Sequence, residues 1–114
     1  MGEAKDKVIL LSSEGCVGED TDLGFEILAA LLGTLPERED RPQAIICWNT
    51  AVKLLAEVSP LLSQLKSSEE KGIMILAGQM CVKELGLTNK IKVGKPVAMG
   101  RLLDVILHGD VISL

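Results

Sequence analysis

The stretch that decides the fold is QAIICW, residues 43–48, a short apolar run without alternation of polar and apolar residues. A continuous run of this kind is typical of a strand that is covered on both faces, as in a parallel sheet. Residues 8–11, 72–76 and 110–114 form similar runs, and a shorter strand is expected at residues 90–93. The chain therefore carries about five predicted strands.

The segments between these strands have the spacing of amphipathic helices. Asp20 or Thr21 is a suitable N-cap for the first helix, which should end before Pro36. Because each strand is followed by a crossover of more than a dozen residues, we predict one α/β domain, residues 1–114, with an open, mostly parallel sheet and helices on both faces. Helices are expected at about residues 20–35, 49–59, 60–71, 80–85 and 97–107.

Composition excludes several classes of protein. The 114 residues carry a formal charge of −4 and 2% aromatic residues, which disfavours nucleic acid and anionic lipid as main partners. The apolar runs are too short to cross a membrane, and the first residues lack the pattern of a signal peptide. Three cysteines without paired spacing fit reduced thiols, so we expect a cytoplasmic protein.

The three cysteines mark the candidate site, because ligands in parallel sheets gather beyond the carboxyl ends of the strands. Cys81 lies in a turn that enters a short helix, where unpaired backbone amides favour a thiolate. A thiolate there is a suitable nucleophile for a sulfane sulfur, which it would hold as a persulfide. The alternative is a buried, inert thiol, since cysteine is often a core residue.

The other two cysteines favour different interpretations. Cys16 lies between Gly15 and Gly18 and is either a second reactive thiol or a loop residue that faces a pocket; we favour the loop residue. Cys47 lies inside an apolar strand, where core packing explains it.

Other kinds of site have little support in the sequence. The cysteines and His108 show no zinc-ligand spacing, and His108 is explained as a cation at a helix C-terminus, so no metal is predicted. No glycine-rich phosphate loop is present, and the single histidine gives no hydrolase triad. We therefore predict no cofactor.

Several motifs resemble the DsrE/DsrF-like family, and most closely the DsrE-like domain of YedF-like proteins, which are sulfurtransferase-like proteins linked to selenium metabolism. The resemblance covers nearly the whole chain, from Val8 to Leu114. It depends mainly on Glu69-Glu70-Lys71-Gly72 before a strand and on the following Cys81. Further matches are Asn49-Thr50-Ala51-Val52-Lys53-Leu54, Leu65-Lys66, Ile75-Leu76, Leu85-Gly86-Leu87, Val93-Gly94, Met99, Leu102-Leu103, Asp110-Val111-Ile112 and Leu114.

The resemblance implies a three-layer α/β/α fold (Rossmann-like) and a sulfur relay, with the persulfide on Cys81. It also implies a homo-oligomer, commonly a trimer or hexamer, which would explain why the first helix is apolar over a wide arc. The chain departs from the YedF-like pattern in two ways. Gly78 stands where those proteins often have a second cysteine, and the chain has no TusA-like domain with a Cys-Pro motif. Sulfur would then come from a separate TusA-like carrier, unless the protein works alone.

We therefore expect a sulfurtransferase-like protein with Cys81 as the catalytic residue. A non-catalytic oligomeric binding subunit with a structural Cys81, and a small-molecule binder that uses the loop around Gly15 and Gly18, are the alternatives. The expected binding residues are Gly15, Cys16, Gly18, Asn49, Gly78, Gln79 and Met80.

Overall fold

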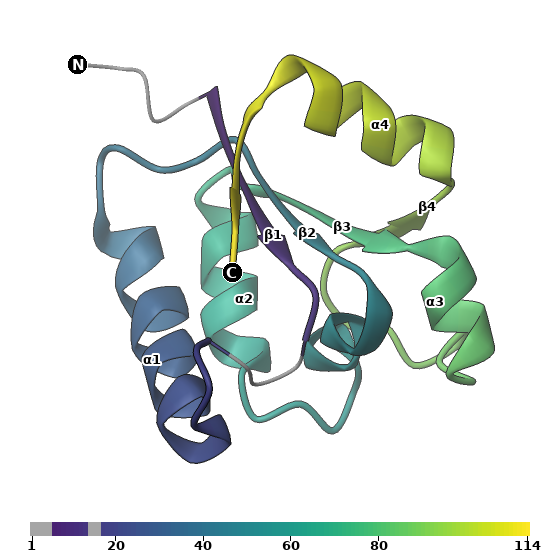
Figure 1. Cartoon of the computed structure of the whole chain (residues 1–114), viewed down its shortest axis with the longest axis horizontal. Helices are drawn as coiled ribbons and strands as arrows, with labels where there is room; N and C mark the ends of the chain where they lie inside the picture. Colours follow the sequence, from purple (N-terminus) through teal and green to yellow (C-terminus); the bar gives the residue numbers. More distant parts are fainter. Residues whose placement is uncertain (1–5, 14–16) are drawn as a thin grey trace.

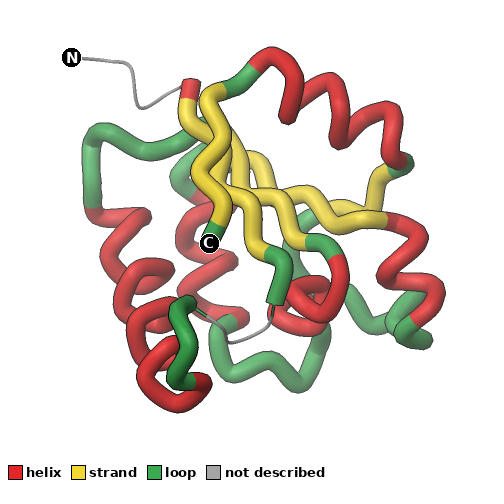
Figure 2. The backbone as a smooth tube through the Cα atoms, in the orientation of Figure 1, coloured by secondary structure: helices red, strands yellow, loops and turns green. Residues whose placement is uncertain are grey.

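A computed structural model of the protein describes residues 6–13 and 17–114. Five strands form one sheet in the order β4-β3-β2-β1-β5, and every neighbouring pair is parallel. Figures 1 and 2 show this sheet between the helices. The strands are β1 (Lys7–Leu11), β2 (Ala44–Cys47), β3 (Met74–Gly78), β4 (Lys95–Val97) and β5 (Asp110–Ser113). The α-helices are α1 (Thr21–Thr34), α2 (Leu62–Glu70), α3 (Gln79–Glu84) and α4 (Met99–His108), and the 3-10 helices are η2 (Leu35–Glu37) and η3 (Asn49–Leu55).

The sheet is covered on both faces, as the continuous apolar runs predict. Alternate residues of one strand point to opposite faces. On β1, Ile9 and Leu11 belong to the core beneath α1, α2 and η3, whereas Val8 and Leu10 pack in the core beneath α4. The helices accordingly lie on opposite sides of the sheet in Figure 1. The predicted α/β sandwich of about five parallel strands is confirmed.

The first crossover forms where the sequence predicts it. The Asp20 side chain accepts a hydrogen bond from the backbone N–H of Leu23 (2.9 Å), which satisfies one of the free amides at the start of α1. The second crossover is broken near Ser59-Pro60 as expected, but its first part is the 3-10 helix η3 and α2 begins only at Leu62.

The position of the fourth sheet strand was predicted wrongly. Residues 90–93 do not join the sheet: Ile91 forms only an isolated antiparallel bridge with Ala56. The chain then turns at Gly94, whose φ is +77°, and residues 95–97 form β4 at the sheet edge. Pro96 is tolerated there because an edge strand needs only one row of ladder hydrogen bonds.

The starts of β3 and α4 also differ from the expected positions. Strand β3 was expected at residues 72–76, but Gly72 turns the chain with φ +94° and the strand runs from Met74 to Gly78. The segment before Cys81 is therefore strand as far as Gly78 and is not a free turn. Helix α4 begins at Met99, two residues later than expected, since Val97 belongs to β4.

Within residues 6–13 and 17–114, no helix has the length and apolar character that a membrane crossing requires.

Candidate functional site

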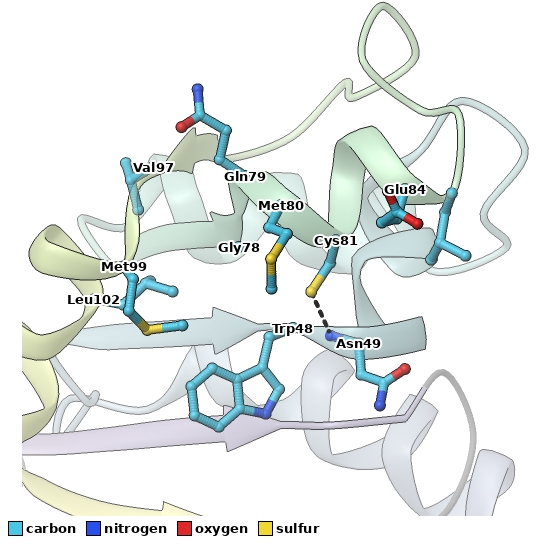
Figure 3. Close-up of a pocket in the computed structure, with 11 residues that line it drawn as sticks. Trp48, Asn49, Gly78, Gln79, Met80, Cys81, Glu84, Val97, Met99 and Leu102 are labelled. Carbon is cyan, nitrogen blue, oxygen red and sulfur yellow. Dashed lines mark hydrogen bonds between the residues drawn. The ribbon is translucent and has the colours of Figure 1, made fainter.

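A pocket of about 490 Å³ opens at the carboxyl ends of β2, β3 and β4. Its walls come from the first residues of α3, from the start of α4 and from the residues that follow β2 (Figure 3). This is the edge at which parallel sheets place their ligands. The lining residues are Trp48, Asn49, Gly78, Gln79, Met80, Cys81, Glu84, Leu85, Val97, Met99 and Leu102.

Cys81 forms part of the pocket wall. It lies in the first turn of α3 and is partly exposed. Its Sγ accepts a hydrogen bond from the backbone N–H of Asn49, with a nitrogen–sulfur distance of 3.1 Å. The sulfur is thus held in a defined position between α3 and the end of β2, while the pocket gives a ligand access to it (Figure 3).

The residue that donates to this sulfur has an unusual backbone conformation. Asn49 has φ +53°, and among the described residues it is the only non-glycine residue with a positive φ. Asparagine tolerates the left-handed region better than most residues. Non-glycine residues held there cluster at functional sites. The residue that donates to Cys81 is thus also the one at which the chain turns from β2 into η3.

Gly78 leaves space beside the sulfur. A Cβ atom at this position would lie 3.5 Å from the Cys81 Sγ and 3.4 Å from the Trp48 Cβ. These are ordinary contact distances, so a side chain here would occupy part of the pocket next to the thiol. A glycine therefore keeps that approach open.

The remaining predicted residues of α3 line the pocket in different ways. Met80 is 70% exposed, and its thioether extends toward Trp48 in Figure 3. Gln79 is a lining residue, but its amide points away from the sulfur of Cys81. The structure therefore brings together Asn49, Gly78, Gln79, Met80 and Cys81, all of which the sequence singled out.

Of the predicted loop residues, only Gly18 lies within the described ranges. Gly18 has φ +90°, is exposed and does not line the pocket. Gly15 and Cys16 lie outside the described residues. A role for this loop stays a prediction.

Sequence reasoning missed Trp48, Met99 and Leu102, which form the wall opposite Cys81. The Trp48 indole N–H donates to the Ser12 hydroxyl (3.1 Å), and this bond orients the ring. One signal was available: Trp48 is the last residue of the predicted strand of residues 43–48, at the edge where ligands gather. Met99 could not be placed, because α4 was expected to begin earlier.

The described part of the chain holds no group of three or more His, Cys, Asp and Glu side chains that would bind a metal. The Nδ1 atom of His108 donates to the backbone carbonyl of Asp104 (2.8 Å) in the last turn of α4. This contact lies within one helix, so His108 acts there as a local cap.

Cys47 is a core residue with no exposed surface, as predicted. Burial disfavours the charged form of the thiol and raises its pKa from 9.0 to about 12. Cys47 thus stays a neutral thiol at physiological pH, and its sulfur is inaccessible to reagents. Of the two cysteines in the described ranges, only Cys81 reaches a pocket.

Because burial raises the pKa of Cys47, the stability of the folded protein should depend on pH in the alkaline range. In the unfolded chain this thiol ionises near pH 9, whereas in the folded protein it keeps its proton to about pH 12. The free energy of unfolding should therefore decrease as the pH rises through this interval, by up to ~1.4 kcal/mol per pH unit. Urea unfolding of wild type and Cys47→Ala at pH 8 and pH 10.5 measures this. Equal losses in the two proteins would contradict the assignment.

Comparisons with known proteins establish the fold. No family model matches the sequence, and no curated protein matches it. A solved structure of a conserved protein of unknown function from Bacteroides thetaiotaomicron is similar, with a TM-score of 0.68, 24% identity and coverage of 98% of this chain and 97% of that chain. The ychN protein from E. coli is similar with a TM-score of 0.69, 12% identity and coverage of 96% of this chain and 99% of that chain. Both likenesses support the predicted three-layer α/β fold with a parallel sheet of about five strands.

Proposed function

We propose that this protein is a sulfur-relay protein of the DsrE-like type, in which Cys81 accepts a sulfane sulfur as a persulfide and passes it on. The observation that carries the proposal is the contrast between two thiols. Cys81 lines an open pocket and has a fixed backbone donor at 3.1 Å, whereas Cys47 is sealed in the core. The resemblance of the sequence around Cys81 to the DsrE/DsrF-like family gives the reaction class.

The reaction is an exchange at sulfur. The Cys81 thiolate attacks the terminal sulfur of a donor persulfide, R–S–SH, and a new S–S bond forms as the S–S bond of the donor breaks. The donor leaves as the thiolate R–S⁻, and Cys81 becomes Cys81–S–SH with the proton on the transferred sulfur. In the second half, an acceptor thiolate attacks the same sulfur and Cys81 leaves as a thiolate. No external oxidant or reductant is needed.

The site residues have distinct roles in this proposal. The Asn49 N–H stabilises negative charge on the Cys81 sulfur, both when it attacks and when it leaves, because hydrogen bonds to charged acceptors are the strong ones. Gly78 leaves room for the donor sulfur beside Sγ. Trp48, Met99 and Leu102 form the opposite wall, which limits water around the sulfur.

Mapping the modified thiol tests the proposal. The native protein is treated with a persulfide donor, excess donor is removed, and the modified cysteine is identified by mass spectrometry of peptides. We expect the added sulfur on Cys81 and none on Cys47. Modification confined to Cys16 or Cys47, or an adduct that an acceptor thiol does not remove, would argue for a non-catalytic binding protein.

The partners follow from the same proposal. We propose a homo-oligomer, a trimer or hexamer, and a TusA-like carrier as sulfur donor in a reducing cytoplasm that keeps both thiols free. Apolar side chains on two helices support the oligomer: Leu23 and Ile27 on α1 are 54% and 43% exposed, and Leu107 on α4 is 72% exposed. Because α1 and α4 pack on opposite faces of the sheet, these side chains form two separate apolar sites that a second copy of the chain would cover. Sedimentation velocity should give a trimer or larger, and a monomer at high concentration would contradict this part.

A further inference from the structure

The pocket around Cys81 differs from the rest of the surface in its charge. Of the residues that line it, all of them described, one side chain carries a charge, and that is the carboxylate of Glu84. The nearest cation in sequence, Lys83, follows Cys81 by two positions and therefore projects from another side of α3. Lys95 and Arg101 line a separate pocket near β4. No lining residue offers a positive partner to an anionic ligand.

The lining is instead apolar and polarisable. Trp48, Met80 and Met99 surround the space in front of the Cys81 sulfur in Figure 3, and Leu102 lies beside Met99. Thioethers and aromatic rings make favourable contacts with polarisable groups such as sulfur. A carboxylate or sulfonate placed here would lose hydration, and the lining holds no cationic side chain to replace it. The volume of about 490 Å³ lies in the range of small-molecule pockets.

We propose that the sulfur donor of this site enters the pocket through an uncharged apolar group, and that the site excludes anionic donors such as thiosulfate. The inference deepens the proposed function and uses it only for the sulfur-transfer step. A small aliphatic persulfide and an apolar segment beside a carrier protein's persulfide present the same chemistry to the pocket. The carboxylate of Glu84, as part of the lining, repels anions, and the wall of Trp48, Met80 and Met99 binds the apolar group.

Two alkylating reagents test the charge preference without sulfur transfer. Iodoacetamide is neutral and iodoacetate is anionic, and they share size and leaving group. The ratio of their rates at Cys81 is measured in the native protein and in the urea-unfolded chain by peptide mass spectrometry. We expect the native ratio to exceed the unfolded one at least about fivefold in favour of iodoacetamide, the effect of roughly one close like-charge contact in water. Equal ratios, or a native preference for iodoacetate, would overturn the inference.

Matched variants assign the effect to the pocket. Glu84→Gln should reduce the native preference for iodoacetamide, whereas Glu37→Gln removes the same charge from η2 and should leave the preference unchanged. Met80→Lys places a cation at an exposed position of the pocket and should raise the iodoacetate rate. An equal effect of both Gln variants would mean that net charge, and not the pocket, sets the preference, and would overturn the assignment.

A second arm uses sulfur donors. Propyl persulfide and 2-carboxyethyl persulfide differ mainly in the carboxylate, and we expect the propyl compound to load Cys81 at least about fivefold faster. A short peptide with a cysteine persulfide between two leucines represents a protein-borne donor. Faster loading by the peptide than by propyl persulfide points to a carrier, and slower loading points to a small molecule.

Equal loading by the neutral and anionic small donors overturns the inference but leaves the relay intact. If none of the three donors loads Cys81 while the reagents still discriminate, the relay fails and the pocket preference stands.

Discussion

Replacing Cys81 by serine should abolish sulfur loading of the protein while leaving it folded. A hydroxyl cannot form the S–S bond of a persulfide, and serine is a weak nucleophile without an adjacent base. The serine oxygen can still accept the hydrogen bond from the Asn49 N–H, so the free energy of unfolding should change by no more than ~1 kcal/mol. Persulfide content after donor treatment, measured with circular dichroism on the same samples, checks both expectations.

Cys47→Ala is the matched control for this variant. It removes the buried thiol, destabilises the core by ~1 kcal/mol and should load sulfur as the wild type does. If Cys81→Ser retained full loading, the acceptor would be another cysteine. If Cys47→Ala also lost loading while remaining folded, the contrast between the open and the sealed thiol would no longer explain the reaction.

Gly94→Ala should have the largest effect on stability. Gly94 has φ +77°, and a Cβ there would lie 2.7 Å from Cγ2 and 2.8 Å from the backbone oxygen of Ile75 in β3. The substitution combines a left-handed alanine with a clash against a central part of the sheet. We expect a loss of ~2–5 kcal/mol in the free energy of unfolding, measured by urea unfolding. Such a loss is a large fraction of the stability of a small domain.

Gly86→Ala separates the two causes. Gly86 has a similar φ of +70°, but no atom lies within 4 Å of the Cβ it would gain. It should therefore show only the conformational cost of ~1–2 kcal/mol. Equal losses in the two variants would mean that the contact with Ile75 relaxes without cost. If the clash between the new Cβ and Ile75 pushes the chain away from β3, β4 should shift, and with it Val97 at the pocket.

The architecture was predictable because burial on both faces leaves a direct trace in the sequence. Residues 43–48 read as a continuous apolar run, and the structure pairs β2 with both β1 and β3. The fourth strand was not predictable in the same way. The alternation Lys90-Ile91-Lys92-Val93 resembles a strand, yet its backbone bonds to the end of η3, and Pro96 concealed the true edge strand. Apolar sequence patterns indicate which residues are buried, and the edge strand β4 has no fully buried residue, so its sequence carries no such pattern.

The candidate site was predictable where it follows a strand directly. Cys81 and Gly78 could be placed beyond the third strand from topology alone. The donor to Cys81 could not, since it is the backbone N–H of a residue 32 positions away, and only the tertiary structure brings the two together. The apolar wall from Met99 and Leu102 required the correct start of α4. Local sequence thus identified the candidate thiol, but the groups that surround it depend on tertiary structure.

The pairing of β1 with β5 has a consequence for how the protein is made. Lys7 and Asp110 are ion-paired neighbours in the sheet, although 103 residues separate them in the chain. At a translation rate of about 5–20 residues per second, the ribosome needs roughly 5–20 s between the two. During that interval one edge of β1 has no partner and can pair with another nascent chain. Chaperone protection during synthesis, rather than the final stability, should then limit the yield of this protein at high expression levels.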